Sequence, residues 1–316
     1  MRDVVIVGGG LTGLVAAYTL AEHAVDVTLI EVKRHLGGSI QSITKDNSIM
    51  DTTTFAIHNS LDKTWLSSLG LDDTLIALDD NSVAFKAGTA SLIAALQQKI
   101  TATRLMRMAV SSIGDLDGGR YSICMENGLM FDARSLILAL PARYAERIFY
   151  GYITPITATL LDYHYDTIQR VSLVCKTDAL PSIISIPDDM AYTAIHRTSH
   201  PARVPDGYTL LQIGLRIDPK RYDTSEKMIN FVCEIFNLPQ PLTSHVGYWA
   251  EADPISCYDD QHPQRIQAIR EQLPQGIALV GSDYSQQPPM HIGVTRLDDR
   301  IQQGIHAAHQ VLATLS

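Results

Sequence analysis

The sequence has no uninterrupted apolar run that approaches roughly 20 residues, so it contains no segment typical of a helix that spans a bilayer. No charged leader and apolar signal core precede its first expected strand, and we therefore expect no secretory signal peptide. Lys and Arg number only 25 against 34 Asp and Glu, and the net charge of −9 argues against nucleic acid or an anionic membrane surface as a partner. These absences predict a cytoplasmic protein that handles a small-molecule substrate, while peripheral contact with a membrane stays open.

Patterns for several other chemistries are also missing. The four cysteines are scattered and include no C-x-x-C pair, which is typical of reduced and mostly buried thiols. No G-x-S-x-G elbow is present, so acyl transfer through a serine has no support. His306 and His309 have a spacing that can hold a metal on a helix, but no cysteine or acidic residue accompanies them at ligand spacing. We therefore predict no metal site.

The overall composition is that of an ordinary globular enzyme. With 316 residues the chain is long enough for a large core and two domains. A hydrophobic content of 46% with 19% charged residues is typical of a folded protein. The function must therefore be sought in local motifs.

The most informative motif opens the chain. An apolar run of strand length, Asp3 to Val7, leads directly into Gly8, and apolar residues recur at helical spacing after Gly13. A second apolar strand begins at Val27 and ends on Glu31. This is a βαβ unit with the G-x-G-x-x-G spacing of a dinucleotide-binding fold.

Each glycine of the motif has a physical task. Gly8 permits a tight turn out of the strand, Gly10 lets a pyrophosphate approach the backbone, and Gly13 lets the helix pack close to the sheet. Glu31 stands where a carboxylate accepts both ribose hydroxyls, and it would repel a 2′-phosphate. From these residues alone the cofactor is either FAD or NAD. Amides at the helix start carry partial positive charge that favours phosphate, and they include those of Leu11, Thr12 and Gly13.

The residues after Glu31 carry a resemblance to a known family. An acid followed closely by a basic residue and Gly-Gly resembles the FAD-binding opening of the protoporphyrinogen oxidase and flavin-containing amine oxidase superfamily. The resemblance implies that the glycine pair brings backbone amides onto the second phosphate of FAD. His35 stands where the family has arginine, Arg34 lies one residue early, and Ser39 replaces a final basic residue. We therefore expect backbone amides to carry more of the phosphate neutralisation. The segment runs Val32, Lys33, Arg34, His35, Leu36, Gly37, Gly38 and Ser39.

Later segments also resemble that superfamily and imply further contacts with FAD. One strand end would lie beside the flavin, a valine would contact the adenine, and a tryptophan would flank the isoalloxazine ring; plain core packing would explain the valine and the tryptophan equally well. The N-terminus of the last helix would point at the flavin N1–C2=O, where negative charge develops on reduction. The implied contacts are Thr54, Val110, Ala139, Pro141, Trp249, Gly281, Ser282, Asp283, Leu297 and Asp298.

We expect an α/β fold in which a discontinuous, Rossmann-like FAD-binding domain carries a second, smaller α+β substrate domain on a mixed or antiparallel sheet. The FAD-binding domain is assigned to residues 1–57, 85–150 and 276–316, and the substrate domain to residues 58–84 and 151–275. The pattern predicts a meander within 107–131, a separate buried strand at 136–140, and substrate-domain strands that include 183–186. The large helical insertion of protoporphyrinogen oxidases is missing, so the chain would be a compact form.

The resemblance implies an FAD-dependent oxidoreductase, either an oxidase or a dehydrogenase. Hydride would pass from a substrate C–H bond to flavin N5, and oxygen or a quinone would reoxidise the flavin. Two other interpretations stay open, namely a renalase-like oxidase of dihydronicotinamides and an FAD-binding subunit without turnover. His58, Tyr258 and Arg296 are candidates for the pocket, but the sequence assigns no catalytic residue. It also leaves open the substrate, the electron acceptor, homo-oligomerisation and covalent attachment of FAD.

Overall fold

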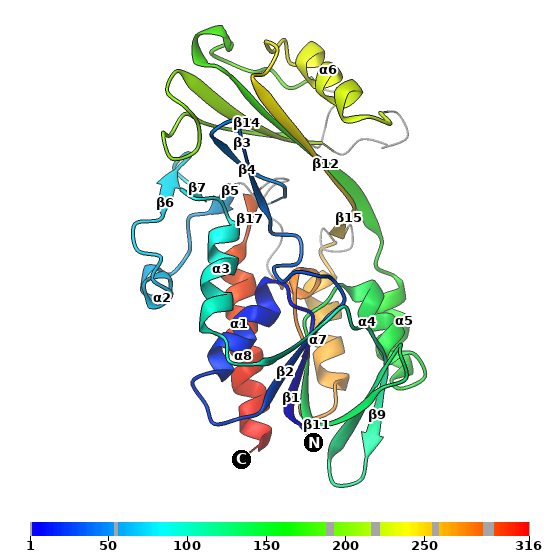
Figure 1. Ribbon diagram of the computed structural model, residues 1–316. Coiled ribbons are helices and arrows are strands. Elements are labelled where there is room, and N and C mark those ends of the chain that lie inside the picture. The colour runs from blue at the N-terminus through cyan, green and yellow to red at the C-terminus, as the bar shows by residue number, and fades with distance from the viewer. Residues whose placement is uncertain are drawn as a thin grey trace.

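The computed structural model describes residues 2–53, 56–187, 193–215, 222–254, 259–286 and 294–315. Within these ranges the chain forms a lower part built on a mainly parallel sheet and an upper part built on an antiparallel sheet (Figure 1). Both chain ends lie at the bottom of the lower part, far from the upper sheet (Figure 1). None of the helices in these ranges is long and apolar enough to cross a membrane.

The lower sheet has seven strands in the order β8-β2-β1-β11-β10-β9, with β16 beside the end of β11. Five of them, β8, β2, β1, β11 and β16, run parallel, so their carboxyl ends meet at one edge of the sheet. The other two extend the sheet in antiparallel fashion. The strands are β1 (Arg2–Val7), β2 (Val27–Glu31), β8 (Thr103–Met106), β9 (Val110–Leu116), β10 (Arg120–Met125), β11 (Met130–Leu138) and β16 (Ile277–Leu279).

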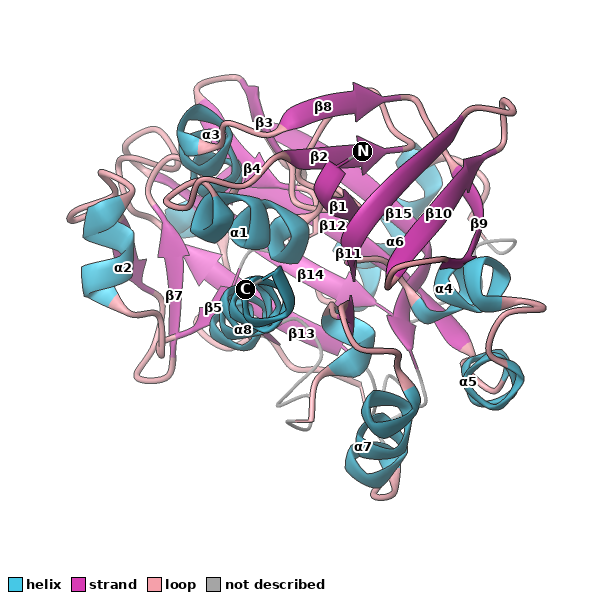
Figure 2. Cartoon of the chain, turned by 90° about the horizontal axis from the view of Figure 1, so that it is seen from below, coloured by secondary structure: helices cyan, strands magenta, loops and turns pink. Residues whose placement is uncertain are grey.

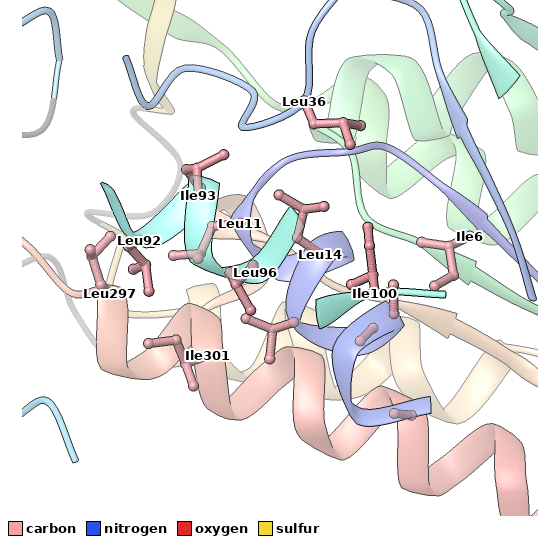
Figure 3. Close-up of a cluster of buried hydrophobic side chains, with 14 of the residues drawn as sticks. Ile6, Leu11, Leu14, Leu36, Leu92, Ile93, Leu96, Ile100, Leu297 and Ile301 are labelled. Carbon is pink, nitrogen blue, oxygen red and sulfur yellow. The ribbon is translucent and has the colours of Figure 1, made fainter. Parts of the chain in front are cut away.

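Side chains along β1 point alternately to the two faces of this sheet, and a separate group of helices covers each face. Ile6 points to the face covered by α1, α3 and α8, where it belongs to the same buried cluster as Leu14, Leu96 and Ile301 (Figure 3). Val5 points to the opposite face, which α4, α5 and α7 cover. Figure 2 shows the two groups of helices on opposite sides of the sheet. Their bounds are α1 (Leu11–Leu20), α3 (Ala90–Lys99), α4 (Ala142–Phe149), α5 (Thr154–Leu161), α7 (His262–Gln272) and α8 (Leu297–Leu315).

The upper sheet is fully antiparallel and has the strand order β13-β14-β12-β15. Its outer face packs on α6 (Ser225–Ile235) through residues such as Leu173 and Val232. Its inner face turns towards the rest of the molecule, where Val174 packs against Met50. The strands are β12 (Tyr165–Lys176), β13 (Thr193–Thr198), β14 (Tyr208–Leu215) and β15 (Thr243–Pro254).

Two small sheets connect the lower and upper parts (Figure 1). One is the hairpin of β3 (Ser42–Lys45) and β4 (Ser48–Asp51), which lies under the inner face of the upper sheet. The other has the order β17-β5-β7-β6, with the short helix α2 (Lys63–Ser68) between β5 and β6. The expected domain boundaries at 57/58 and 84/85 fall inside β5 (Ala56–His58) and β7 (Ser82–Phe85); the remaining strands are β6 (Leu75–Ala77) and β17 (Val294–Thr295).

The structure differs from the expected strand pattern at two places. The meander strand and the buried strand expected to be separate are one strand, β11. The polar residues in the middle of β11 form ion pairs at the rim of the sheet: Asp132 pairs with Arg120, and Arg134 pairs with Asp3. The expected strand at 183–186 is irregular, since prolines at 181 and 187 flank it and Ile183 is 79% exposed.

Candidate functional site

The glycine turn after β1 is a conformation that only glycine fits. Gly8 has φ +106°, and a Cβ on it would lie 2.2 Å from the carbonyl oxygen of Ala139. A Cβ on Gly13 would lie 2.0 Å from the carbonyl oxygen of Gly8. The first turn of α1 is therefore pressed onto the ends of β1 and β11. These contacts bring Gly8, Gly13 and Ala139 together at one place.

The two glycine motifs meet at the start of α1. Gly10 caps the helix without any side-chain hydrogen bond, so the first amides of the helix point outward uncapped. A Cβ on Gly10 would meet nothing closer than the Cα of Gly38 at 4.0 Å. The Gly37 amide donates to the carbonyl oxygen of Gly9 at 2.7 Å and fixes the second motif against the first. The result is an open surface of backbone amides, which fits the phosphates of a dinucleotide.

Glu31 lies at the carboxyl end of β2, beside this surface. Its side chain is only 6% exposed, and its two oxygens accept the amides of Gly9 and Lys33 at 2.7 Å each. Each carboxylate oxygen accepts more than one hydrogen bond. The amides therefore hold the carboxylate in place and leave it capacity for ribose hydroxyls.

The segment between Glu31 and the second glycine pair has its charged side chains on the surface. Val32, Arg34 and His35 are exposed. Nε2 of the His35 ring lies 3.0 Å from Gln41 Nε2, and its Nδ1 lies 3.3 Å from the Leu36 carbonyl oxygen. Lys33 brings a cation to the second glycine pair, because its Nζ lies 3.4 Å from the Gly38 carbonyl oxygen. Sequence reasoning had not singled out this lysine.

The end of the chain returns to the same edge of the sheet. Gly281 follows β16, and its amide donates to Gln303 Oε1 of α8 at 2.9 Å. A Cβ on Gly304 would lie 2.7 Å from the Thr12 carbonyl oxygen, so α8 crosses close to the start of α1. The carboxy-terminal helix and the amino-terminal glycine turn, far apart in sequence, thus adjoin one site.

Other expected cofactor residues have contacts within the protein. Asp283 is buried, and its Oδ2 accepts the Ala142 amide at 2.9 Å at the start of α4, which Pro141 caps. Tyr165 donates to the same oxygen at 2.5 Å. Ser282 is exposed, and Val110 is half-buried at the start of β9. The hydroxyl of Thr53 donates to the carbonyl oxygen of Ser39 at 2.5 Å. The Leu297 side chain lies in the core with Leu92 (Figure 3).

Two of the pocket candidates are linked at the start of α8. Arg296 pairs with Asp298 at 3.0 Å. Ser60 also bonds to Asp298, and His58 Nδ1 lies 2.8 Å from Ser60 Oγ. Burial acts to raise the pKa of Asp298, but the bonds from Arg296 and Ser60 outweigh it and hold that pKa below its usual value. His58 and Arg296 therefore belong to one polar chain. Thr54 and the third candidate, Tyr258, lie outside the described residues, and of Trp249 only the backbone in β15 is described.

A buried ion pair that sequence reasoning missed joins the upper part to the connecting hairpin of β3 and β4. Arg203, in the loop between β13 and β14, pairs with Asp51 at 2.7 Å, and both side chains are fully buried. Arg203 also donates to the carbonyl oxygens of Ile49 and Phe85. Asp51 in turn accepts the Thr89 amide at 2.8 Å and the Ser42 hydroxyl at 2.5 Å.

Further polar side chains lie on the inner face of the upper sheet. Arg170 of β12 is buried, and Ser172 follows it on the same face. Gln212 of β14 donates to the Asp51 carbonyl oxygen at 2.7 Å and to Ser172 at 2.6 Å. His196 of β13 pairs in register with Gln212, and burial together with the Arg170 charge lowers its pKa to about 4. The only sequence signal for this cluster is that Arg170 and Gln212 interrupt apolar strands. The described residues hold no group of three or more His, Cys, Asp or Glu side chains placed for a metal.

Comparison with known sequences agrees with this geometry. Residues 6–69 match the family model of the NAD(P)-binding Rossmann-like domain. Coproporphyrinogen III oxidase of Bacillus subtilis is 26% identical over 250 residues, which cover 72% of this chain and 50% of that protein. The chain thus spans about half the length of this curated relative. A mitochondrial protoporphyrinogen oxidase of Nicotiana tabacum is 39% identical over 50 residues, covering 16% of this chain and 10% of that protein.

Solved structures show the same fold along almost the whole chain. A candidate protoporphyrinogen oxidase from Exiguobacterium sp. 255-15 has a TM-score of 0.77 at 14% identity, and the match covers 98% of each chain. Cyclohexylamine oxidase from Brevibacterium oxydans has a TM-score of 0.71 at 12% identity and 99% coverage of each chain. The resemblance inferred from the motifs is thereby confirmed: the chain is similar in sequence to a coproporphyrinogen oxidase and a protoporphyrinogen oxidase, and it shares its α/β fold with solved structures of the protoporphyrinogen oxidase and amine oxidase type.

Proposed function

We propose that the chain is an FAD-dependent oxidoreductase of the protoporphyrinogen oxidase and amine oxidase type. The observation that carries the proposal is the meeting of three separate segments at one sheet edge: the turn at Gly10, the glycine pair at Gly38, and the Gly281–α8 segment. A dinucleotide needs backbone amides for its phosphates and a carboxylate for its ribose, and both are present.

The residues of the chain divide the binding task between the ends of the cofactor. Glu31 would accept the ribose hydroxyls, and the amides at the start of α1 would bind one phosphate. The Gly38 amide would bind the other phosphate, since the Gly37 amide already donates to the Gly9 carbonyl oxygen. The α8 N-terminus, with Leu297 and Asp298, would face the pyrimidine side of the flavin. FAD, when bound, supplies the hydride acceptor. His58 and Arg296 are the described side chains proposed for the pocket wall.

The substrate-side proposal follows from the relatives. A porphyrinogen-type substrate is supported by the similarity to the Bacillus coproporphyrinogen III oxidase over most of this chain. An amine and a dihydronicotinamide remain the alternatives, as does an FAD-binding subunit without turnover. We further propose that residues 1–57, 85–150 and 276–316 form the FAD-binding domain and that the inner face of the upper sheet borders the substrate.

The absorbance spectrum of the purified protein tests cofactor binding. We expect the bands of oxidised flavin, either as purified or after incubation with FAD and removal of the excess. A protein that remains colourless after this treatment would overturn the proposal. Incubation with NAD in place of FAD is the control, and it should give no retained chromophore near the flavin bands.

Anaerobic mixing distinguishes the candidate substrates. Loss of flavin absorbance with a porphyrinogen, but not with an amine or a dihydronicotinamide, is the expected result. Bleaching by the dihydronicotinamide alone would favour the renalase-like alternative. Failure of all three donors, with dithionite still reducing the flavin, would favour a subunit without turnover.

A further inference from the structure

A buried polar side chain of α8 holds the turn that follows β16. Gln303 is 8% exposed and lies near the start of the helix, among residues that pack into the core. Its Oε1 accepts the Gly281 amide at 2.9 Å, and its Nε2 donates to Asp299 Oδ2 at 2.7 Å. Only this orientation of the side-chain amide suits both neighbours, because an N–H group donates and a carboxylate oxygen accepts. Both polar atoms of Gln303 therefore have the partner that a buried amide requires.

The backbone of Gly281 has a conformation that favours glycine. Its φ is +140° and its ψ is −176°, which residues with a Cβ rarely adopt. In this conformation the amide donates to α8, so its hydrogen bond is made within the protein. A cofactor contact at this turn therefore falls to a group other than the Gly281 amide.

The rest of the turn is anchored in the core. The Asp283 carboxylate accepts the first amide of α4 at 2.9 Å, and the Tyr284 hydroxyl donates to the Leu140 carbonyl oxygen at 3.0 Å. Asp283 and Tyr284 are both buried, whereas Ser282, which precedes them, is exposed. The position of Ser282 thus depends on bonds on both sides of it, and the bond on the Gly281 side comes from α8.

One turn of α8 contacts both halves of the proposed nucleotide site. Gly304 follows Gln303 directly, and a Cβ on Gly304 would lie 2.7 Å from the Thr12 carbonyl oxygen of α1. The two helices lie side by side in Figure 1. Two neighbouring residues of one helix therefore set the spacing between the start of α1 and the Gly281 turn.

We infer that Gln303 is a positioning residue for the cofactor. It fixes Gly281, and Gly281 in turn fixes Ser282 at the sheet edge that carries the amides at the start of α1. A turn that is already ordered binds its ligand more tightly, because binding does not have to order it. This inference rests on the proposed function for the identity of the ligand, whereas the bond between Gln303 and Gly281 is present without any ligand.

Hydrogen exchange of the apoprotein tests the bond itself. Gln303→Met removes both side-chain hydrogen bonds while a side chain of similar length fills the space. We expect the Gly281 amide to exchange at least about tenfold faster in this variant, as measured by NMR. Gln302→Met makes the same change at an exposed position of α8 and should exchange as the wild type does. An unchanged rate at Gly281 in Gln303→Met would overturn the inference, because another contact would then hold the turn.

Titration with FAD, followed by flavin fluorescence, tests the consequence for binding. Gln303→Met should bind FAD at least about tenfold more weakly than the wild type, since the turn is no longer held in place. Gln302→Met should bind FAD with wild-type affinity.

A reciprocal exchange of two polar groups separates positioning from a general loss of stability. Gln303→Glu alone brings a second carboxylate to Asp299 and should weaken FAD binding. Adding Asp299→Asn restores both hydrogen bonds with reversed polarity, and Arg270 of α7, whose charged form Asp299 favours, keeps an acid nearby. We expect the double variant to bind FAD within about threefold of the wild type, because the two substitutions are coupled. A double variant as weak as Gln303→Glu would overturn the inference, and this comparison decides it even if Gln303→Met does not fold.

The FAD affinity of the wild type separates the two proposals. A wild-type protein that binds no FAD would refute the proposed function, and with it the role of Gln303 towards FAD, whatever the exchange rate at Gly281. Equal FAD affinity of the wild type and Gln303→Met, with faster exchange at Gly281 in the variant, would refute the inference alone.

Discussion

At the scale of single residues, two glycines of one turn should respond differently to an added methyl group. Gly10→Ala meets no protein atom within 4.0 Å, and its φ of −74° suits alanine. We expect unfolding of the apoprotein to change by less than about 1 kcal/mol, as for helix caps, while FAD affinity falls at least tenfold because the methyl group occupies the phosphate surface. Fluorescence titration with FAD and urea unfolding measure the two quantities.

The control for this pair is Gly114→Ala in β9, whose added Cβ makes only an ordinary contact of 3.4 Å with Ser122 of β10. It should change neither quantity. Gly8→Ala should instead prevent stable folding, since its Cβ would overlap the backbone of Ala139. Wild-type FAD affinity in Gly10→Ala would contradict the proposed position of the phosphates.

The buried pair of Asp51 and Arg203 should be far more important for stability than an exposed pair. Asp51→Asn leaves the Arg203 guanidinium buried without its counter-charge, and we expect a loss of about 3–5 kcal/mol in the free energy of unfolding. Asp26→Asn breaks the exposed pair with Arg2 and should cost no more than about 1 kcal/mol. Urea unfolding compares them, and equal losses would show that Arg203 finds another partner.

Residue identity alone could not reveal these polar clusters. The glycines and Glu31 were predictable because their spacing in sequence is short and fixed by one βαβ unit. Arg203 and Asp51 lie far apart in sequence, and only the folded chain brings the loop after β13 onto β4. Arg170 is visible in the sequence as a charge in an apolar strand, but which face of the sheet it occupies depends on strand register.

At the scale of elements, the contact between α1 and α8 should control both stability and cofactor binding. Gly304→Ala would place a Cβ 2.7 Å from the Thr12 carbonyl oxygen and 2.9 Å from Val15. Alanine favours a helix by about 1 kcal/mol over glycine, but overpacking costs about 1–3 kcal/mol. We expect a net loss of stability and weaker FAD binding, because the start of α1 must move.

His306→Ala, on the exposed side of the same helix, is the control for that substitution and should behave as the wild type. Circular dichroism melting and FAD titration give the two measurements. A Gly304→Ala protein that is more stable than the wild type and binds FAD normally would show that the helices can separate without effect on the site.

Helices could be predicted from apolar periodicity more reliably than strands, because the extent of a strand depends on its partners. The sequence predicts helices over residues 89–100, 225–236, 263–273 and 298–315, and α3, α6, α7 and α8 agree with these ranges to within one residue at each end. The strands were harder, because β11 changes partners along its length, from β10 to β16, and its polar middle interrupts the apolar pattern. The short strand β8 was missed, since only its parallel pairing with β2 defines it.

At the scale of the whole molecule, stability should fall as the solution becomes acidic. Burial lowers the pKa of His196 to about 4 and also lowers the pKa values of His245 and His262. The unfolded chain, with histidine pKa values near 6.5, then binds more protons than the folded chain. The stabilisation is complete above about pH 6.5 and is lost progressively as the pH falls towards about 4.

Urea unfolding between pH 7.5 and pH 4.5 measures this loss. His196→Gln removes the titrating group with the largest shift, and its stability curve should be flatter over that interval than the wild-type curve. His306→Ala, at an exposed position, should keep the wild-type slope. A slope that His196→Gln leaves unchanged would assign the acid sensitivity to the other two histidines.

The position of β16 and α8 at the end of the chain has a consequence for biosynthesis. Their residues complete a sheet edge that β1 and α1 begin, so a nascent polypeptide on the ribosome holds only part of the proposed nucleotide site until the segment with β16 and α8 has emerged. Contacts between such distant segments form slowly. Binding of the proposed cofactor would then follow the synthesis of both segments, and a bound nucleotide would hold these two distant parts of the polypeptide together.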